Sequence, residues 1–421
     1  MKTLRPLIVL LCATCSIPPL FAATFIVPPD RDMVTQATAV VVASALNSHT
    51  QLNDASGIET ITAMSVEEVI KGNIHGDTFD VYEPGGVYGK RRLVIPGIPR
   101  FADGERYVLF LMQYKGTWRV LNLVLGKFTF KTDISGHEVL VRDTNEISGW
   151  DQDGKQHREV NRAAEPFLDF IRGTVSGGPA RQEYNIPAEP LLQVSTSAQK
   201  HGLRPSPLCV FPCTPTSYTY LYDPPRGARW ISFPVTYYYK DANAAAITAF
   251  TNAIAAWNND PGSNVNIMNG GADAGNEVGG ILGATDGQST VWFERSMAPF
   301  GGTSPISCTG SSYFGNPLGV GAVTNTLGTH MGPNGETFDT TTEGDVEMNQ
   351  GMSTCAYMIG LGDFNSAVAH EVGHTLGFRH SDEDRISRFG PGTMPCNTDA
   401  TLECSNSAIM KAYIPSGLMG L

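Results

Sequence analysis

The segment from His370 to His380, which reads HEVGHTLGFRH, constrains this 421-residue chain more than any other feature. An α-helix turns once every 3.6 residues, so His370 and His374 project from the same face and can bind one metal ion together. Glu371 lies beside the first histidine, where it can reach a metal-bound water. Gly377 allows a sharp exit from the helix through a positive φ, which brings His380 back as a third ligand. Three neutral imidazoles leave a coordination position open, as in a catalytic zinc site.

The residues before this segment predict a domain that begins after Trp230. Residues 233–239 are expected to form a strand, and Asp241 is a candidate helix cap. Apolar side chains then recur at helical spacing and predict a helix that packs on the sheet: Ile247, Phe250, Ile254 and Trp257. Short strands are expected over 318–326 and 344–349. A second helix is expected from roughly Asn365 to Gly377, and it carries the histidines.

The long zinc motif resembles that of the metzincin metallopeptidases. Ser381 after the third histidine and the Ser366–Ala369 stretch before the first are similar to the matrixin branch. The segments 318–320 and 344–349 look like the sheet strands before the zinc helix in bacterial matrixin-like proteins. The resemblance spans about Trp230 to Tyr413. It implies an α+β zincin-like catalytic domain, with a twisted mixed sheet and a zinc helix.

The resemblance also implies roles for single residues. His370, His374 and His380 would bind Zn²⁺, and Glu371 would be the catalytic base that activates a zinc-bound water. A methionine turn would support the metal from below without binding it. Met410, within Ser407–Met410, is the preferred candidate, and Met394 is the alternative. Tyr413 is given no role.

The function implied is that of a zinc-dependent endopeptidase, which hydrolyses internal peptide bonds of a protein or peptide substrate. The substrate would lie extended along an exposed sheet edge, near residues 318–323. A structural Ca²⁺ is a further expectation of the family. Acidic residues in Gly- and Asn-rich loops permit it, although ordinary solvated loop acids explain them equally well: Asp260, Asp273, Asp286, Asp339 and Asp345.

Residues 24–174 alternate strand-like runs with turn signals and predict an all-β sandwich or barrel-like domain. A hairpin is expected within Tyr107–Leu125, and a short helix near Glu165–Ile171 closes the domain. Residues 175–218 are rich in proline and predict a linker. The metallopeptidase domain then covers 219–421. The N-terminal domain is either a pro-region or a binding domain.

The N-terminus predicts export. Lys2 and Arg5 precede an apolar run that ends in small residues, which is typical of a signal peptide over 1–22, with a retained membrane anchor as the alternative. We therefore expect a secreted protein, or one held in a periplasm or at a cell surface. No stable membrane insertion is expected.

Six cysteines remain after the signal peptide, and an even number in an exported chain favours disulfides. Six cysteines allow 15 pairings. Pairing local neighbours joins Cys209 to Cys213 and Cys396 to Cys404, which leaves Cys308 with Cys355. A thiolate from the Cys209–Cys213 segment that blocks the zinc is an alternative, although the segment does not match the matrixin switch sequence.

The formal net charge of −12, with no block of Lys or Arg, argues against nucleic acid as a partner. Nothing in the chain indicates its oligomeric state.

Two rival functions stay open. One is a surface-binding protein in which residues 24–174 hold a ligand and the zinc domain is vestigial. The other is a zinc hydrolase of non-peptide substrates.

Overall fold

The structure is a computed structural model with two described parts. It describes residues 24–186, except 54, 56, 94, 134, 143–147 and 151–158, and residues 227–378, except 261–262, 311–312, 315–316 and 333–334, together with Met410. The signal peptide expected over 1–22 lies outside these residues. So do residues 187–226, which include most of the expected linker. Among the described residues, no helix has the length and apolar character needed to cross a membrane.

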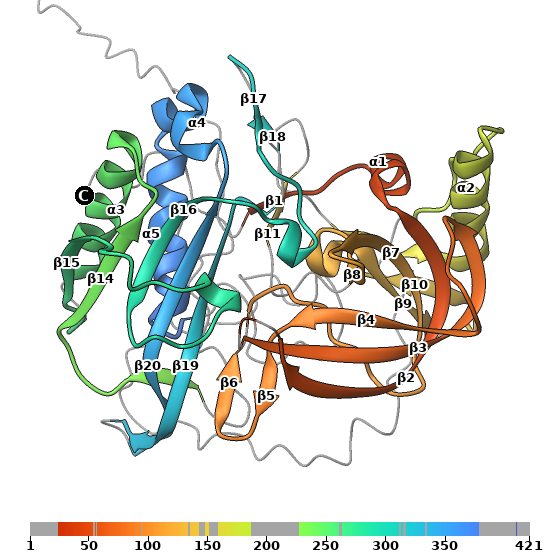
Figure 1. Cartoon of the computed structure of the whole chain (residues 1–421). Coiled ribbons are helices and arrows are strands. Elements are labelled where there is room, and N and C mark those ends of the chain that lie inside the picture. The colour runs from red at the N-terminus through yellow and green to blue at the C-terminus, as the bar shows by residue number, and fades with distance from the viewer. Residues whose placement is uncertain are drawn as a thin grey trace, which may run out of the picture.

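The first part, the N-terminal region (24–186), is built on one large sheet (Figure 1). Its strands follow the order β12-β10-β9-β7-β2-β3-β4-β8, and β8 also pairs with β7, so that β2, β3, β4, β8 and β7 form a closed ring. Their bounds are β2 Ala39–Leu52, β3 Ile58–Lys71, β4 Thr78–Pro84, β7 Arg106–Tyr114, β8 Thr117–Val120, β9 Lys127–Thr132, β10 Glu138–Val141 and β12 Arg162–Ala163. The β7–β8 pair confirms the predicted hairpin.

Smaller elements complete this region. Strands β1 (Thr24–Ile26) and β11 (Ser148–Trp150) pair in parallel, and β5 (Gly86–Tyr88) and β6 (Arg91–Leu93) form an antiparallel hairpin. The helices are α1 (Asp30–Gln36), α2 (Ala164–Ser176) and the 3₁₀ turn η1 (Leu123–Gly126). The region is therefore rich in strands, as predicted, but it also contains helices.

Helix α2 and the residues after it extend the N-terminal region beyond its predicted end. The expected helix near Glu165–Ile171 continues to Ser176. Tyr184, within the expected linker, packs its ring 4.7 Å from that of Phe170, and its carbonyl oxygen accepts a hydrogen bond from the Ala163 amide. Residues 177–186 are thus held against α2 and β12.

The second part, the C-terminal region (227–378), contains a mixed sheet of order β15-β14-β16-β20, to which β13 and β19 are added along β20. All pairs are parallel except β19–β20. The strands are β13 Ala228–Trp230, β14 Val235–Lys240, β15 Ile267–Ala272, β16 Ser289–Arg295, β19 Gly319–Met331 and β20 Thr337–Asn349. A separate short pair joins β17 (Ser307–Cys308) to β18 (Tyr313–Phe314).

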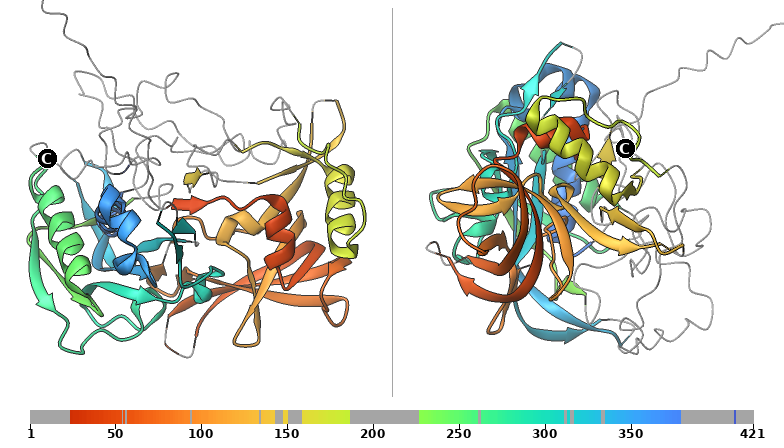
Figure 2. Two further views of the ribbon diagram at one scale, coloured as in Figure 1. Left: turned by 90° about the horizontal axis from the view of Figure 1, so that it is seen from above. Right: turned by 90° about the vertical axis from the view of Figure 1, so that its right-hand side faces the viewer.

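Among the residues described here, three α-helices and three 3₁₀ turns accompany this sheet: α3 Ala244–Asn258, α4 Ala356–Leu361, α5 Asp363–Thr375, η3 Gly280–Leu282, η4 Ala298–Phe300 and η5 Met352–Thr354. Helices α3 and α5 lie side by side on one face of the sheet (Figures 1 and 2), which we call the front face. Their apolar side chains and those of the sheet form one buried cluster, which includes Phe250, Trp257 and Phe293. The face opposite is the back face.

The start of α3 differs from the prediction. The capping residue is Asn243 and not Asp241, because the Asn243 side chain accepts the Ala246 amide at 3.0 Å. Asp241 instead adopts a positive φ of 53° and accepts the Trp292 indole N–H at 2.6 Å. The core-facing stripe is as expected for Phe250, Ile254 and Trp257, which are all buried.

These observations establish a mixed α/β protein with large sheets and few helices. The strand-rich N-terminal region agrees with the prediction.

Candidate metal centre

The candidate metal centre lies on α5, at the front face of the mixed sheet. His370, Glu371 and His374 are at most 1% exposed. The Nε2 atoms of the two histidines are 3.0 Å apart, with the rings nearly perpendicular at 88°. Zinc–nitrogen bonds of about 2.0–2.1 Å in a tetrahedral site place two imidazole nitrogens roughly 3.3 Å apart. The two side chains therefore fit two positions of a zinc site.

A backbone carbonyl orients His374. Its Nδ1 atom lies 2.8 Å from the Phe378 oxygen, and only a protonated Nδ1 can donate to a carbonyl. In the neutral ring this leaves a lone pair on Nε2, which is the atom that faces His370. Such a hydrogen bond to the far nitrogen is the usual support of a metal-binding histidine.

The end of α5 makes this carbonyl available. Gly377 has φ of +99°, and a Cβ there would lie 2.1 Å from the Ala228 oxygen, so only glycine fits. The left-handed residue terminates the helix, as the sequence predicts, and the Phe378 amide turns back to the Gly373 oxygen at 3.2 Å. His380, the third predicted ligand, lies outside the described residues.

Met410 lies against α5 at Gly373. It is 2% exposed, and its sulfur occupies the place that a side chain on Gly373 would take, 2.0 Å from the position of a Cβ. A Cβ on Gly373 would also lie 2.5 Å from the Trp257 ring, and Trp257 donates its indole N–H to the Ala369 oxygen at 2.8 Å. Met394 lies outside the described residues.

Glu371 lies on the side of α5 that faces β19. A Cβ on Gly321 would be 2.1 Å from the Glu371 carbonyl oxygen, and one on Gly319 would be 3.0 Å from its side chain. Two glycines on the same side of β19 thus let the strand approach the helix at backbone distance. Among the described strands, β19 pairs only with β20. The edge strand and the predicted catalytic base are neighbours.

Polar contacts anchor the end of the helix to the sheet. Thr375 accepts or donates a hydrogen bond with the Tyr237 hydroxyl at 2.7 Å, and its carbonyl oxygen accepts the Trp230 indole N–H at 3.0 Å. Burial raises the pKa of Tyr237, so the phenol stays neutral in the physiological range. Residue order alone contains no signal for these partners, nor for the Phe378 carbonyl. The sequence indicates only that these residues are aromatic and that Tyr237 lies in a predicted strand.

The acids considered for calcium have protein partners. Asp273 accepts the Asn276 amide at 3.0 Å, Asp286 accepts the Val278 amide at 3.0 Å, and Asp345 accepts the Thr290 amide at 2.9 Å. Asp339 forms an ion pair with Arg92 at 3.4 Å. Within the described ranges, no three His, Cys, Asp or Glu side chains are grouped so that they could hold a metal ion.

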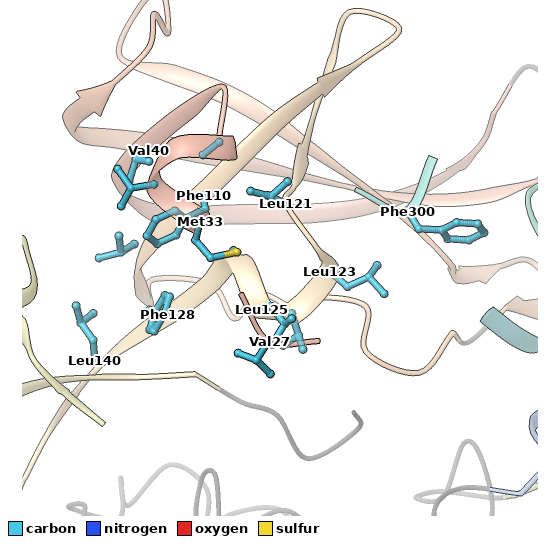
Figure 3. Close-up of a cluster of buried hydrophobic side chains, with 14 of the residues drawn as sticks. Val27, Met33, Val40, Phe110, Leu121, Leu123, Leu125, Phe128, Leu140 and Phe300 are labelled. Atoms are coloured by element: carbon cyan, nitrogen blue, oxygen red, sulfur yellow. The ribbon is translucent and has the colours of Figure 1, made fainter. Parts of the chain in front are cut away.

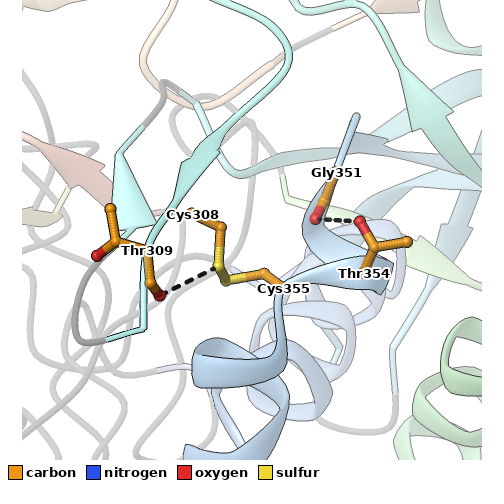
Figure 4. The surroundings of a disulfide bond; sticks show 5 residues. All are labelled: Cys308, Thr309, Gly351, Thr354 and Cys355. Atoms are coloured by element: carbon orange, nitrogen blue, oxygen red, sulfur yellow. Dashed lines mark hydrogen bonds between the residues drawn. A yellow bond between two sulfur atoms is a disulfide. The ribbon is translucent and has the colours of Figure 1, made fainter.

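A disulfide joins Cys308 to Cys355, the pair left by local-neighbour pairing (Figure 4). The two Cα atoms are 5.6 Å apart. The bond ties the connection between β16 and β19 to the start of α4, which leads directly into α5. The other two predicted pairs lie outside the described residues.

No family model matches the chain, and no curated protein matches it.

Proposed function

We propose that the chain is a zinc-dependent endopeptidase with its active site on α5. The observation that carries the proposal is the paired geometry of His370 and His374, whose Nε2 atoms face each other at 3.0 Å while the Phe378 carbonyl holds Nδ1 of His374. His380 would supply the third ligand. The zincin-like architecture and the supporting role of Met410 belong to the same proposal.

Zinc, when bound, would supply a Lewis acid that acidifies water and polarises a peptide carbonyl. Glu371 would accept a proton from the attacking water and return it to the nitrogen of the leaving amine. Its burial against β19 supports this role, because a carboxylate excluded from bulk water exchanges protons only with groups held in the site. Met410 and Trp257 would fix the helix that holds these groups.

A peptide substrate would add to β19 as a further strand. The strand pairs with β20 on one side and with no other described strand, and Gly319 and Gly321 place it beside Glu371. Pairing of an extended backbone with a sheet edge gives affinity with little sequence preference. This arrangement favours cleavage within chains.

Export is part of the proposal, since the bond between Cys308 and Cys355 suits an oxidising compartment. A structural calcium stays a prediction.

The test is hydrolysis of casein and of a peptide library by the wild type and by Glu371→Gln. We expect the variant to keep its zinc, measured by elemental analysis, and to lose about 10²–10⁴-fold in rate. A zinc chelator should abolish hydrolysis by the wild type. Glu336→Gln, at an exposed position on the turn between β19 and β20, is the matched control and should change neither quantity.

Full activity in Glu371→Gln would refute the proposed role of this residue. Zinc binding without chelator-sensitive cleavage of any peptide would instead favour a hydrolase of other substrates. Absence of both zinc and hydrolysis would favour a binding protein with a vestigial zinc domain.

A further inference from the structure

The two faces of the mixed sheet are covered by different parts of the chain. Gly319 and Gly321 of β19 face α5, so the alternate residues Val320 and Ala322 point to the back face. On β20, a Cβ on Gly344 would likewise lie 2.8 Å from Thr375 of α5. The back face is therefore the side away from the histidines.

The N-terminal region covers this back face with apolar side chains. Val320 and Ala322 belong to the same buried cluster as Leu93 of β6 and Leu121 beside η1. The C-terminal region adds Phe300, which Figure 3 places in the same apolar cluster as N-terminal residues such as Leu121 and Leu123. Val320 and Phe300 are 4% and 0% exposed, so this contact excludes water as a protein core does.

Backbone contacts show that the fit is close. The Asn122 amide donates to the Gly301 oxygen at 2.7 Å, and a Cβ on Gly301 would lie 2.0 Å from the Val120 oxygen. A Cβ on Gly57 would similarly lie 2.0 Å from the Leu282 oxygen. Glycines at these points let main chain touch main chain across the two regions. Contacts of this kind are typical of one folded unit and not of domains that move independently.

Polar groups join the same surfaces. The Asn53 side-chain amide donates to the Leu282 oxygen at 3.2 Å, and Arg92 of β6 forms its ion pair with Asp339 of β20 at 3.4 Å. Both Arg92 and Asp339 are largely buried. These groups fix the register of the N-terminal region on the sheet.

We propose that residues 24–186 are a permanent partner of the C-terminal region, docked on the back face, and not a pro-region that blocks the active site. Cutting the chain between the two regions leaves them bound to each other. The N-terminal region then lies on the side of the sheet away from the histidines of α5, and it does not cover them. This last consequence concerns activity and rests on the proposed function, whereas the docking itself does not.

The experiment uses the full chain with a recognition sequence for a specific protease inserted after Ser197. After complete cutting, the fragments are separated by size-exclusion chromatography at about 1 µM, and peptide hydrolysis is measured before and after the cut. We expect the two fragments to elute together at the position of the uncut chain. We expect hydrolysis to change less than twofold.

Phe300→Ala provides the variant that weakens docking, and Leu327→Ala the matched control. Leu327 lies on β19 but is 65% exposed, whereas Phe300 is fully buried in the shared cluster. The uncut variants serve as folding controls, because their covalent link keeps the regions together. After cutting, the Phe300→Ala fragments should dissociate at least tenfold faster than those of the wild type, and the Leu327→Ala fragments at the wild-type rate.

Separate elution of the wild-type fragments at 1 µM would overturn the docking proposal. A more than tenfold rise in hydrolysis when the N-terminal fragment dissociates would show that this region is inhibitory. It would overturn the proposal that the region does not block the active site. Fragments that elute together but never hydrolyse peptide would sink the proposed function alone, with docking intact.

Discussion

Strands β19 and β20 pack differently on the two faces of the mixed sheet. On the front face, Gly319, Gly321 and Gly344 remove side chains so that α5 can approach the strands. On the back face, β20 presents the buried carboxylic acids Glu343, Asp345 and Glu347, and the N-terminal region covers the apolar positions of β19. The front face depends on close backbone contact. The back face depends on partners from distant parts of the chain.

The largest effect is expected from adding a side chain to the front face. In Gly321→Ala the new Cβ meets the Glu371 carbonyl oxygen at 2.1 Å, and backbone on both sides leaves no flexible group to move. Overpacking of this kind costs about 3 kcal/mol. Unfolding in guanidinium chloride measures the stability, and elemental analysis shows whether a displaced α5 also loses the zinc that the proposed site would bind.

Two neighbouring changes sharpen this comparison. Ala322→Gly, on the same strand but on the back face, should cost about 1 kcal/mol, because it removes one methyl group and adds backbone freedom. Gly360→Ala in α4 has no heavy atom within 4 Å of the new Cβ and should be neutral or stabilising. Equal stability of Gly321→Ala and the wild type would contradict the close contact between β19 and α5.

The difference between the faces also separates what the sequence could and could not predict. The front face follows from local rules: the spacing of His370 and His374 predicts a helix with both on one face, and Gly377 has the positive φ that its place suggests. Residues no more than seven positions apart decide these features. Short-range patterns in the chain are sufficient for them.

The back face could not be predicted because its contacts join residues far apart in the sequence. Nothing near Phe300 indicates that it packs with an N-terminal cluster, or that Asp339 pairs with Arg92. Even the choice of Asn243 over Asp241 as the cap of α3 depends on the Trp292 indole, which holds Asp241 elsewhere. Competing tertiary partners, and not propensity, decide such positions.

An effect of similar size is expected at the disulfide that ties the connection between β16 and β19 to the start of α4. Replacing Cys308 and Cys355 together by serine opens a loop that the disulfide closes over a sequence separation of 47 residues. The chain-entropy estimate for such a loop is about 4 kcal/mol, and measured losses are commonly about 2–4 kcal/mol. Thermal unfolding of the double variant, compared with the oxidised wild type, gives the loss, and the reduced wild type should unfold like the variant. A melting temperature equal to that of the oxidised wild type would contradict the claim that this disulfide stabilises the fold.

The smallest effect, and the one that depends on pH, is expected at Glu343 on the back face. Burial raises the pKa of Glu343 to about 7, and Asp286 and Glu277 add to the rise, although the Gly287 amide that its carboxylate accepts at 2.7 Å opposes it. Asp345, whose pKa is also raised by burial, lies beside it, and Lys240 acts on Glu277. The nearby charges are thus mainly negative.

The sign of the pH dependence follows from the raised pKa of Glu343. Below about pH 4.5 the carboxyl is protonated in both the folded and the unfolded chain, so it does not affect the pH dependence. Between about 4.5 and 7 only the folded chain keeps the proton, so this group lowers the stability as the pH rises, and the loss is complete above 7. Glu343→Gln removes the ionisation. We expect the variant to be more stable than the wild type by about 1–2 kcal/mol at pH 8, since the full shift is worth about 3 kcal/mol and the amide accepts the Gly287 N–H less strongly. At pH 4.5 the difference should vanish. Urea unfolding at both pH values measures this stability difference, and the same difference at the two values would show that folding does not change the pKa of Glu343.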